Sequence, residues 1–283
     1  MDRILVPLDG SALAEAILPL AGTLARAHKA GLFLLRAVPQ KSGHGEAEER
    51  EARVYLARLS ERLQDRGVSE VRVLVPHGKP DRAIAEAATE HRVDLIAMTT
   101  HGRTGLSRLL VGSVAESVVR HAPAPVLVVR GQPSWGTGQT LKVLVPLDGS
   151  ELSAAILPVV ERLAGPLDLS IHVLHAIEPL PASAAGASAR FEEIQTFREQ
   201  EAEGYLEKVA RAIEPEGLPV HRVIRVGPAV AVIQQYAQEA AIDLIAMTTH
   251  GRTGLSRLLF GSVAEHVLRA VPIPLVLWKQ REG

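Results

Sequence analysis

One stretch of this sequence occurs twice. Residues 94–116 read DLIAMTTHGRTGLSRLLVGSVAE and residues 243–265 read DLIAMTTHGRTGLSRLLFGSVAE, so that only Val111 and Phe260 differ. A shorter pair, ILVPLDGS at 4–11 and VLVPLDGS at 143–150, precedes it in each half. The chain is therefore predicted to hold two copies of one unit. Core packing accounts for the apolar letters, but accounts much less well for THGRTGLSR, which has few of them and two glycines.

Within each copy, short β-branched runs alternate with helical patterns, and strands such as LIAM are apolar on both faces. The first copy predicts strands near 3–7, 32–38, 71–75, 94–99 and 125–129 and helices near 12–28, 46–66, 80–92 and 113–121. The second predicts strands near 142–146, 169–176, 219–225, 243–248 and 274–278 and helices near 151–164, 190–213, 228–240 and 262–270. This alternation predicts an α/β fold with two doubly wound, Rossmann-like, parallel five-stranded sheets in tandem. The expected strand order in each sheet is 3-2-1-4-5.

The joint between the copies is GQPSWGTGQT, which is rich in glycine and typical of a linker. We therefore expect a first domain at 1–131, a linker at 132–140 and a second domain at 141–283. The last predicted strand of each copy is an apolar edge strand, which proteins rarely leave bare.

Composition excludes several classes of function. The formal charge is −1 and aromatic residues make up 3%, which argues against nucleic acid as a partner. The chain has no cysteine, which excludes thiol catalysis, disulfides and thiolate metal sites. With no apolar run long enough to cross a bilayer and no signal-like opening, we expect no membrane partner and a cytoplasmic location. The absence of both cysteine and asparagine suggests a thermophilic source as a hypothesis.

The repeated motifs follow strands one and four, whose carboxyl ends would be neighbours at the switch point of the sheet, where ligands bind in such folds. Gly102 lets backbone approach a ligand closely. Gly112-Ser113 opens a helix, whose free N–H groups attract anions, and Arg103 can add a charge-assisted contact to phosphate. Asp9 could accept hydrogen bonds from ribose hydroxyls or an adenine amino group. Together these groups would suit a nucleotide.

Structural interpretations of the same residues stay open. Ser113 and Glu116 form a capping-box pattern, as do Ser262 and Glu265. Gly112 could simply allow tight packing ahead of the helix. Asp9 is a common turn residue, and Ser11 is a plausible N-cap.

On the motifs quoted above, the sequence resembles the universal stress protein family in a tandem form. Nucleotide-binding members of that family carry a glycine, two residues, a glycine, nine residues, and then glycine with serine or threonine. Here Gly102 and Gly112-Ser113 match the second and third parts, but Thr99 and Thr248 stand at the first glycine. The resemblance implies ATP, which Mg²⁺ can accompany, in each half. The implied binding residues are Pro7, Asp9, Val38, Met98, Thr99, Gly102, Arg103, Gly112, Ser113 and Val114, with Pro146, Asp148, Ile177, Met247, Thr248, Gly251, Arg252, Gly261, Ser262 and Val263.

Binding does not imply hydrolysis. The sequence has no G-x-x-x-x-G-K-[ST] loop and no G-x-G-x-x-G fingerprint. We therefore expect a regulatory or protective protein of the stress response, with slow ATP hydrolysis at most and no catalytic residues or resident metal. The alternative is an interaction module of the same fold that binds no nucleotide. The resemblance also implies pairing through the strand-five edges, as an internal pseudo-dimer and as an association of two chains.

Overall fold

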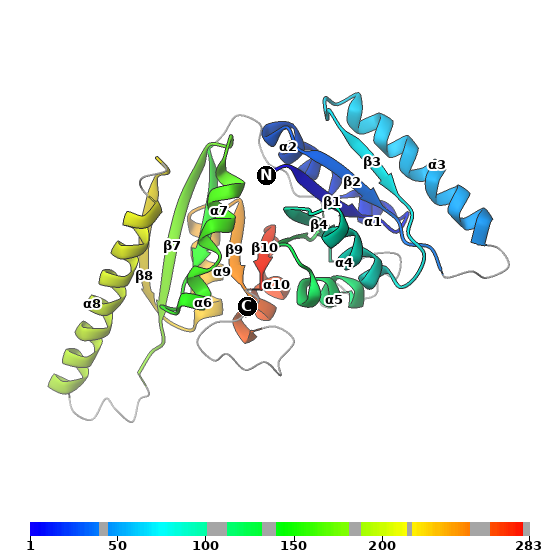
Figure 1. Cartoon of the computed structure of the whole chain (residues 1–283). Coiled ribbons are helices and arrows are strands. Elements are labelled where there is room, and N and C mark those ends of the chain that lie inside the picture. Colours follow the sequence, from blue (N-terminus) through cyan, green and yellow to red (C-terminus); the bar gives the residue numbers. More distant parts are fainter. Residues whose placement is uncertain are drawn as a thin grey trace. The chain divides into compact units, whose positions relative to one another are not determined.

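The computed structural model describes residues 1–39, 45–100, 112–131, 140–180, 188–213, 217–249 and 261–279. The chain divides into two compact units. The first comprises residues 1–137, 165–167 and 272–279, and the second comprises 138–164, 168–271 and 280–283. Each unit is built from alternating strands and helices (Figure 1).

The first unit is built on a largely parallel sheet. Its strands are β1 (Arg3–Pro7), β2 (Gly31–Leu35), β3 (Val71–Leu74), β4 (Leu95–Thr99) and β5 (Val126–Val129), in the order β3-β2-β1-β4-β5. These five are mutually parallel, which is the expected 3-2-1-4-5 arrangement. All five residues of β2 are buried, because helices cover both faces of the sheet.

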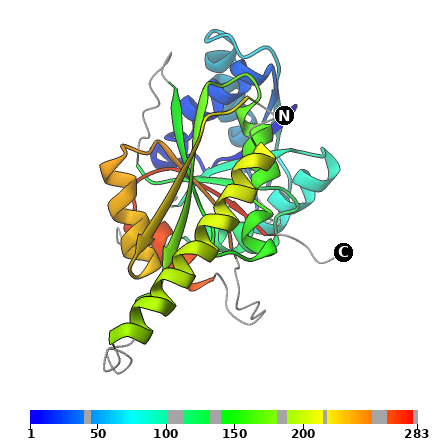
Figure 2. The ribbon, with the colours of Figure 1, turned by 90° about the vertical axis from the view of Figure 1, so that its left-hand side faces the viewer.

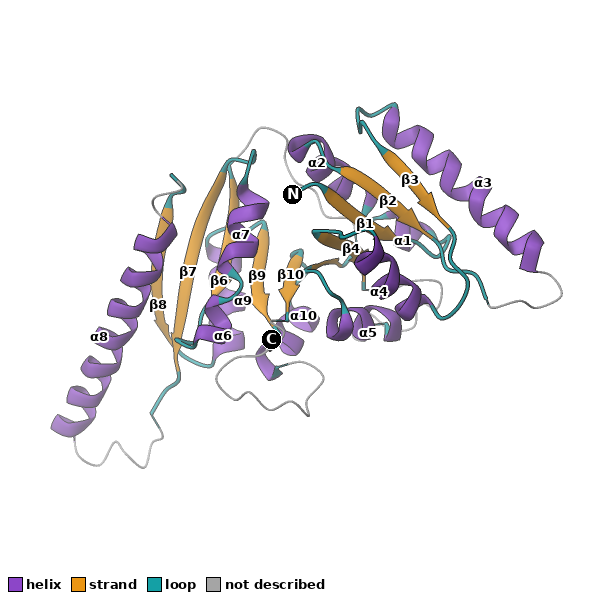
Figure 3. Ribbon diagram, viewed as in Figure 1, coloured by secondary structure: helices purple, strands orange, loops and turns teal. Residues whose placement is uncertain are grey.

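The helices of the first unit fall on two faces. They are α1 (Ala12–Glu15), α2 (Leu18–His28), α3 (Gly45–Gln64), α4 (Pro80–Glu90) and α5 (Ser113–His121). α2 contacts β1 and β2, α3 contacts β2 and β3, and α4 contacts α5. Right-handed crossovers in this strand order place α2 and α3 on one face and α4 and α5 on the other (Figure 3).

The second unit repeats the plan with four parallel strands. These are β6 (Leu141–Pro146), β7 (Leu169–Ile177), β8 (Val220–Val226) and β9 (Leu244–Thr248), in the order β8-β7-β6-β9. Its helices are α6 (Glu151–Ala154), α7 (Leu157–Ala164), α8 (Ser188–Ile213), α9 (Ala229–Glu239) and α10 (Ser262–Ala270). α8 contacts β7 and β8, and Figure 2 shows it lying along these strands.

The fifth strand of the second copy departs in detail from the expected arrangement. β10 (Leu275–Trp278) belongs to the first unit, where it pairs antiparallel with β5, with Val276 opposite Leu127. The pairing satisfies the backbone groups along an apolar edge strand that would otherwise be exposed. These are the two strands whose edges the sequence predicts to pair.

The predicted helix 12–28 is broken in the structure. α1 ends at Glu15 and α2 begins at Leu18, with Pro19 in its first turn. A continuous helix would need the missing N–H of Pro19 to reach the carbonyl of Glu15, and the proline ring would clash with that carbonyl. The predicted helix 151–164 divides in the same way, since Pro158 follows Leu157 at the start of α7.

None of the described helices combines the length and the apolar character that a bilayer-crossing segment requires. The longest, α8, has 26 residues and carries charged side chains along its whole length.

Candidate functional site

The candidate site of the first unit lies where β1 and β4 end. The two strands are hydrogen-bonded neighbours, with Leu5 opposite Ile96, so the segments after Pro7 and Thr99 leave the sheet side by side. The Gly112 N–H donates to the Thr100 carbonyl oxygen at 2.8 Å, which brings the start of α5 to the same edge. The fold thus unites both repeated motifs at the switch point of the sheet.

A cavity of about 880 Å³ opens at this edge. Its walls come from the ends of β1, β2 and β4, the start of α3, the loop before α4 and the start of α5. Eight predicted binding residues line it: Pro7, Asp9, Val38, Met98, Thr99, Gly112, Ser113 and Val114. The two others of this half, Gly102 and Arg103, lie outside the described residues.

The start of α5 differs from the capping-box interpretation. Gly112, not Ser113, is the N-cap residue, and it has no side chain with which to cap the helix. Glu116 instead pairs with Arg120, one turn later, at 3.3 Å. The same holds in the second unit, where Gly261 is the N-cap and Glu265 pairs with Arg269 at 2.7 Å. The capping-box prediction is therefore wrong in both copies. Each serine is the first residue of its helix, one position after the N-cap, whereas a capping box requires the serine to be the N-cap itself.

Gly112 has a structural role of its own. A Cβ at this position would lie 2.8 Å from the Thr100 carbonyl oxygen, closer than real Cβ atoms come to backbone. Its backbone is in the ordinary extended region, with φ of −63°, so the glycine is needed for space and not for an unusual dihedral angle. The tight-packing interpretation of Gly112 is confirmed.

Asp9 shapes the turn after β1. Its Oδ1 accepts hydrogen bonds from the Ser11 N–H at 2.9 Å and from the Ser11 hydroxyl at 2.6 Å. Ser11 Oγ in turn accepts from the Ala14 N–H and caps α1, as predicted. Asp148 and Ser150 repeat this arrangement in the second unit, with distances of 3.0 and 2.6 Å.

The backbone of Val38, implied by the resemblance to contact an adenine ring, already takes part in two hydrogen bonds. Its N–H donates to the Pro76 carbonyl at 2.9 Å, and its carbonyl accepts from the Gly78 N–H at 2.8 Å. A base contact there would use the second lone pair of the Val38 carbonyl.

Four charged residues that the sequence reasoning missed also line this cavity: Arg36, Glu48, Glu51 and Lys79. Arg36 Nη2 lies 3.1 Å from Glu51 Oε1, and its guanidinium carbon lies 5.4 Å from the centroid of the Tyr55 ring. Burial, followed by the negative charge of Glu15, raises the pKa of the Tyr55 hydroxyl, which stays neutral at ordinary pH. The sequence held one signal that Arg36 could line the site: it lies two residues before Val38, near the end of a predicted strand.

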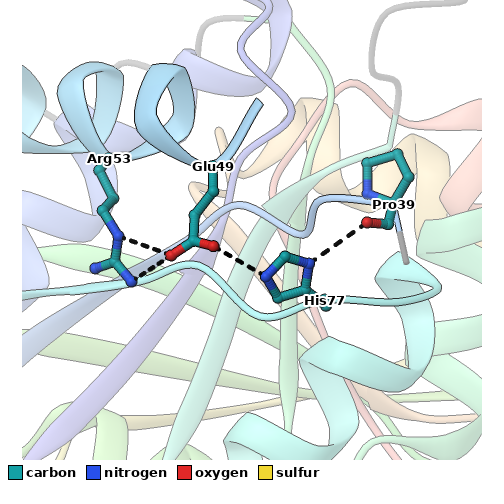
Figure 4. A network of polar contacts seen from close by, with 4 residues as sticks. All are labelled: Pro39, Glu49, Arg53 and His77. Atoms are coloured by element: carbon teal, nitrogen blue, oxygen red, sulfur yellow. Dashed lines mark hydrogen bonds and ion pairs between the residues drawn. The ribbon is translucent and has the colours of Figure 1, made fainter. Parts of the chain in front are cut away.

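A polar network connects Pro39, which lines the cavity, with His77, Glu49 and Arg53 (Figure 4). His77 Nε2 lies 3.0 Å from Glu49 Oε2, and His77 Nδ1 lies 3.5 Å from the Pro39 carbonyl oxygen. Glu49 also accepts two hydrogen bonds from Arg53, which together with His77 lower the pKa of its carboxyl group. The network ties the start of α3 to the segments that follow β2 and β3.

The corresponding cavity of the second unit is smaller, at about 200 Å³. Seven predicted residues line it: Pro146, Asp148, Met247, Thr248, Gly261, Ser262 and Val263. Ile177 is buried and is not among the lining residues. Gly251 and Arg252 lie outside the described residues.

The model of the universal stress protein family matches residues 1–130 and 140–279. The chain belongs to the universal stress protein family. It is 30% identical to a universal stress protein of Methanocaldococcus jannaschii over 49% of this chain and 82% of that one. It is 25% identical to a universal stress protein of Synechocystis over 99% of this chain and 100% of that one.

Among solved structures, a universal stress protein from Archaeoglobus fulgidus matches with a TM-score of 0.77 and 21% identity, covering 98% of both chains. At this identity the likeness concerns the fold. This universal stress protein thus has the tandem α/β architecture of its family, and the chemistry of its site must be argued from its own residues.

Proposed function

We propose that this universal stress protein binds an adenine nucleotide, ATP, at the carboxyl ends of β1 and β4, and that it acts as a regulatory or protective protein of the stress response. One observation carries the proposal. The first unit has a cavity of about 880 Å³ onto which a helix of nine residues opens with a glycine as its N-cap. Cavities of about 300–1,000 Å³ are typical of small-molecule sites.

The two ends of the cavity differ in chemistry. At one end, Gly112, Ser113 and Val114 begin α5, whose first N–H groups and positive dipole end favour a phosphate group. At the other end, Val38 and Pro39, which follow β2, give apolar surface suited to the faces of a base. Asp9 lies at the end of β1, where a ribose hydroxyl would donate to its carboxylate. This order of groups matches base, sugar and phosphate.

Magnesium would enter with the nucleotide. Within the described ranges, no three histidine, aspartate or glutamate side chains gather as metal ligands. Mg²⁺ is usually held by one or two carboxylates together with substrate phosphates and water, and here the triphosphate and water would supply most of its ligands. Phosphoryl transfer also requires a group that orients the attacking water. We therefore propose hydrolysis slower than about one turnover per second.

The second candidate function is an interaction module that binds no nucleotide. Two observations favour it: Gly112 is required by the Thr100 carbonyl, and Asp9 holds the cap of α1, so both have structural roles without a ligand. Thr99, where nucleotide-binding relatives carry glycine, points the same way.

Calorimetry and thermal unfolding with ATP and Mg²⁺ distinguish the two functions. We expect heat of binding and a rise in melting temperature, since a ligand at 100 times its Kd stabilises the folded state by about 2.7 kcal/mol. If ATP, ADP and AMP gave neither heat of binding nor a shift in melting temperature, nucleotide binding would be refuted and the interaction module would be favoured. Adenosine serves as the control for the contribution of the phosphates.

We also propose a cytoplasmic location and association of two chains, as the sequence predicts. Light scattering of the purified protein tests the second point, and a monomeric mass at micromolar concentration would contradict it.

A further inference from the structure

The two cavities differ more than their motifs do. The first measures about 880 Å³ and the second about 200 Å³, which lies below the range of about 300–1,000 Å³ typical of ligand sites. At the phosphate end the lining is the same, with Gly112-Ser113-Val114 matched by Gly261-Ser262-Val263. Among the described residues, the lining differs at the base end, where residues after β2 and from the start of α3 line the first cavity and none from Ile177 to the end of α8 lines the second.

The base end of the first cavity extends past β2. Val38, Pro39 and Lys79 line it, and so do residues from the start of α3. Arg36 forms an ion pair with Glu51 and lies over the face of the Tyr55 ring. The Gly78 N–H donates a hydrogen bond to the Val38 carbonyl, which holds the loop before α4.

The second unit has a different residue at the position that corresponds to Pro39. Strand register places Leu35 opposite Pro7 and Leu174 opposite Pro146, so Glu178 occupies the position of Pro39. Its Oε1 accepts a hydrogen bond from the Ala229 N–H at the start of α9 (3.4 Å), and its carbonyl oxygen accepts one from Arg198 of α8 (2.8 Å). Glu178 thus links the end of β7 to both helices that flank the base end.

The first unit cannot form the equivalent hydrogen bond between the end of β2 and the start of α4. Pro39 has no carboxylate, and Pro80, which corresponds to Ala229, has no N–H to donate. A smaller difference adds to this one, because Ser153 lines the second cavity where Ala14 lines the first, and its hydroxyl is bonded to the Asp148 N–H at 3.3 Å.

We propose that each chain binds one nucleotide, in the first unit, and that Glu178, which does not itself line the second cavity, narrows the base end of that cavity by holding Ala229, which does line it, against the end of β7. This inference rests on the proposed nucleotide binding. The second unit then keeps the phosphate end of the site without room for a base.

Calorimetric titration of the full chain with ATP and Mg²⁺ tests the stoichiometry, which we expect to be one. A matched pair of variants assigns the site: Ser113→Glu and Ser262→Glu each place a carboxylate at a helix start, where the dipole tolerates it and a phosphate would be repelled. Ser113→Glu should lower affinity at least tenfold, and Ser262→Glu should leave it unchanged. Two equal sites, or loss of binding in Ser262→Glu alone, would overturn the inference while nucleotide binding stands. No binding by the unaltered chain would refute the proposed function itself.

Glu178→Ala tests the cause. Glu178 is exposed, so the variant should fold, and we expect a second, weaker ATP site that raises the stoichiometry towards two. Glu239→Ala is the control, because it removes an exposed carboxylate of the same unit that pairs with Gln235 and Arg225 and not with a residue that lines the cavity. A stoichiometry that stays at one in Glu178→Ala would show that the contact of Glu178 with Ala229 does not narrow the cavity.

Discussion

The backbone N–H of Gly112 donates to the carbonyl oxygen of Thr100 at 2.8 Å, and a side chain on Gly112 would collide with that same oxygen. This contact joins the end of β4 to the start of α5 in the first unit. Gly261 and Thr249 make the equivalent bond at 2.5 Å in the second. The pair fixes where the α5 N-terminus points, and so it connects the stability of each unit to the geometry of its candidate phosphate site.

Gly112→Ala should destabilise the first unit. The added Cβ would sit 2.8 Å from a backbone oxygen, and overpacking of this kind costs about 1–3 kcal/mol of unfolding free energy. The urea midpoint of the first unit measures it. Gly204→Ala is the control: it lies inside α8 with nothing within 4 Å of the new Cβ, and should stabilise by about 0.5–1 kcal/mol. Equal effects of the two changes would contradict the contact.

Thr99→Gly should tighten ATP binding in the first unit. Threonine stands where nucleotide-binding relatives carry glycine, and it lines the cavity next to Gly112. Removing its branched side chain should lower Kd by a factor of about 5–10, equal to about 1 kcal/mol. Thr99→Val keeps the shape and removes the hydroxyl, so it separates the two effects. Weaker binding by both variants would mean that the hydroxyl contributes to the site.

The second unit should lose stability in mild acid because of His172. This side chain is 7% exposed on β7, its Nδ1 lies 2.7 Å from the Tyr236 hydroxyl, and its ring stacks on His221 at 4.6 Å. Burial, followed by the positive charges of His221 and Lys142, lowers the pKa of His172 to about 4.

The sign of the effect follows from the direction of this shift. Between pH 6.5 and 4 the unfolded chain binds the proton and the folded chain does not, so stability is full above pH 6.5 and falls as pH approaches 4. The full loss is about 3 kcal/mol. His172→Phe, which copies Phe33 at the same register of the first unit, should reduce the slope of stability against pH in this window. An unchanged slope in urea titrations from pH 7 to 4 would count against the assignment.

Ser11→Ala and Ser150→Ala should each destabilise one unit by about 1 kcal/mol. Each serine caps the first helix of its unit. Its hydroxyl donates a hydrogen bond of 2.6 Å to the aspartate two residues earlier. Amide hydrogen exchange should accelerate in α1 for the first change and in α6 for the second. Exchange that rises in neither helix would show that the caps contribute little.

A melting midpoint above about 65 °C is expected if the chain comes from a thermophile, as its lack of cysteine and asparagine suggests. Calorimetric melting of the purified protein measures it, and a midpoint between about 45 and 65 °C would argue against that origin.

Local pattern was enough for the alternation of strands and helices, because a strand such as Leu95–Thr99, which is apolar except for its last residue, has few alternatives to a buried parallel sheet. The sequence-based prediction failed where it did not take account of a local steric constraint. Pro19 and Pro158 break helices that apolar spacing alone made continuous. Gly112 takes the cap position because Ser113 already has helical geometry.

The sequence by itself determined that the chain has two copies of one α/β unit and that the motifs after strands one and four share an edge, since repeats and strand periodicity are local properties. Only the tertiary structure decided the sizes of the two cavities and the antiparallel register of β10 on β5. Both arise from contacts between residues that are distant in sequence, such as Val276 with Leu127, which form only once the elements are packed together.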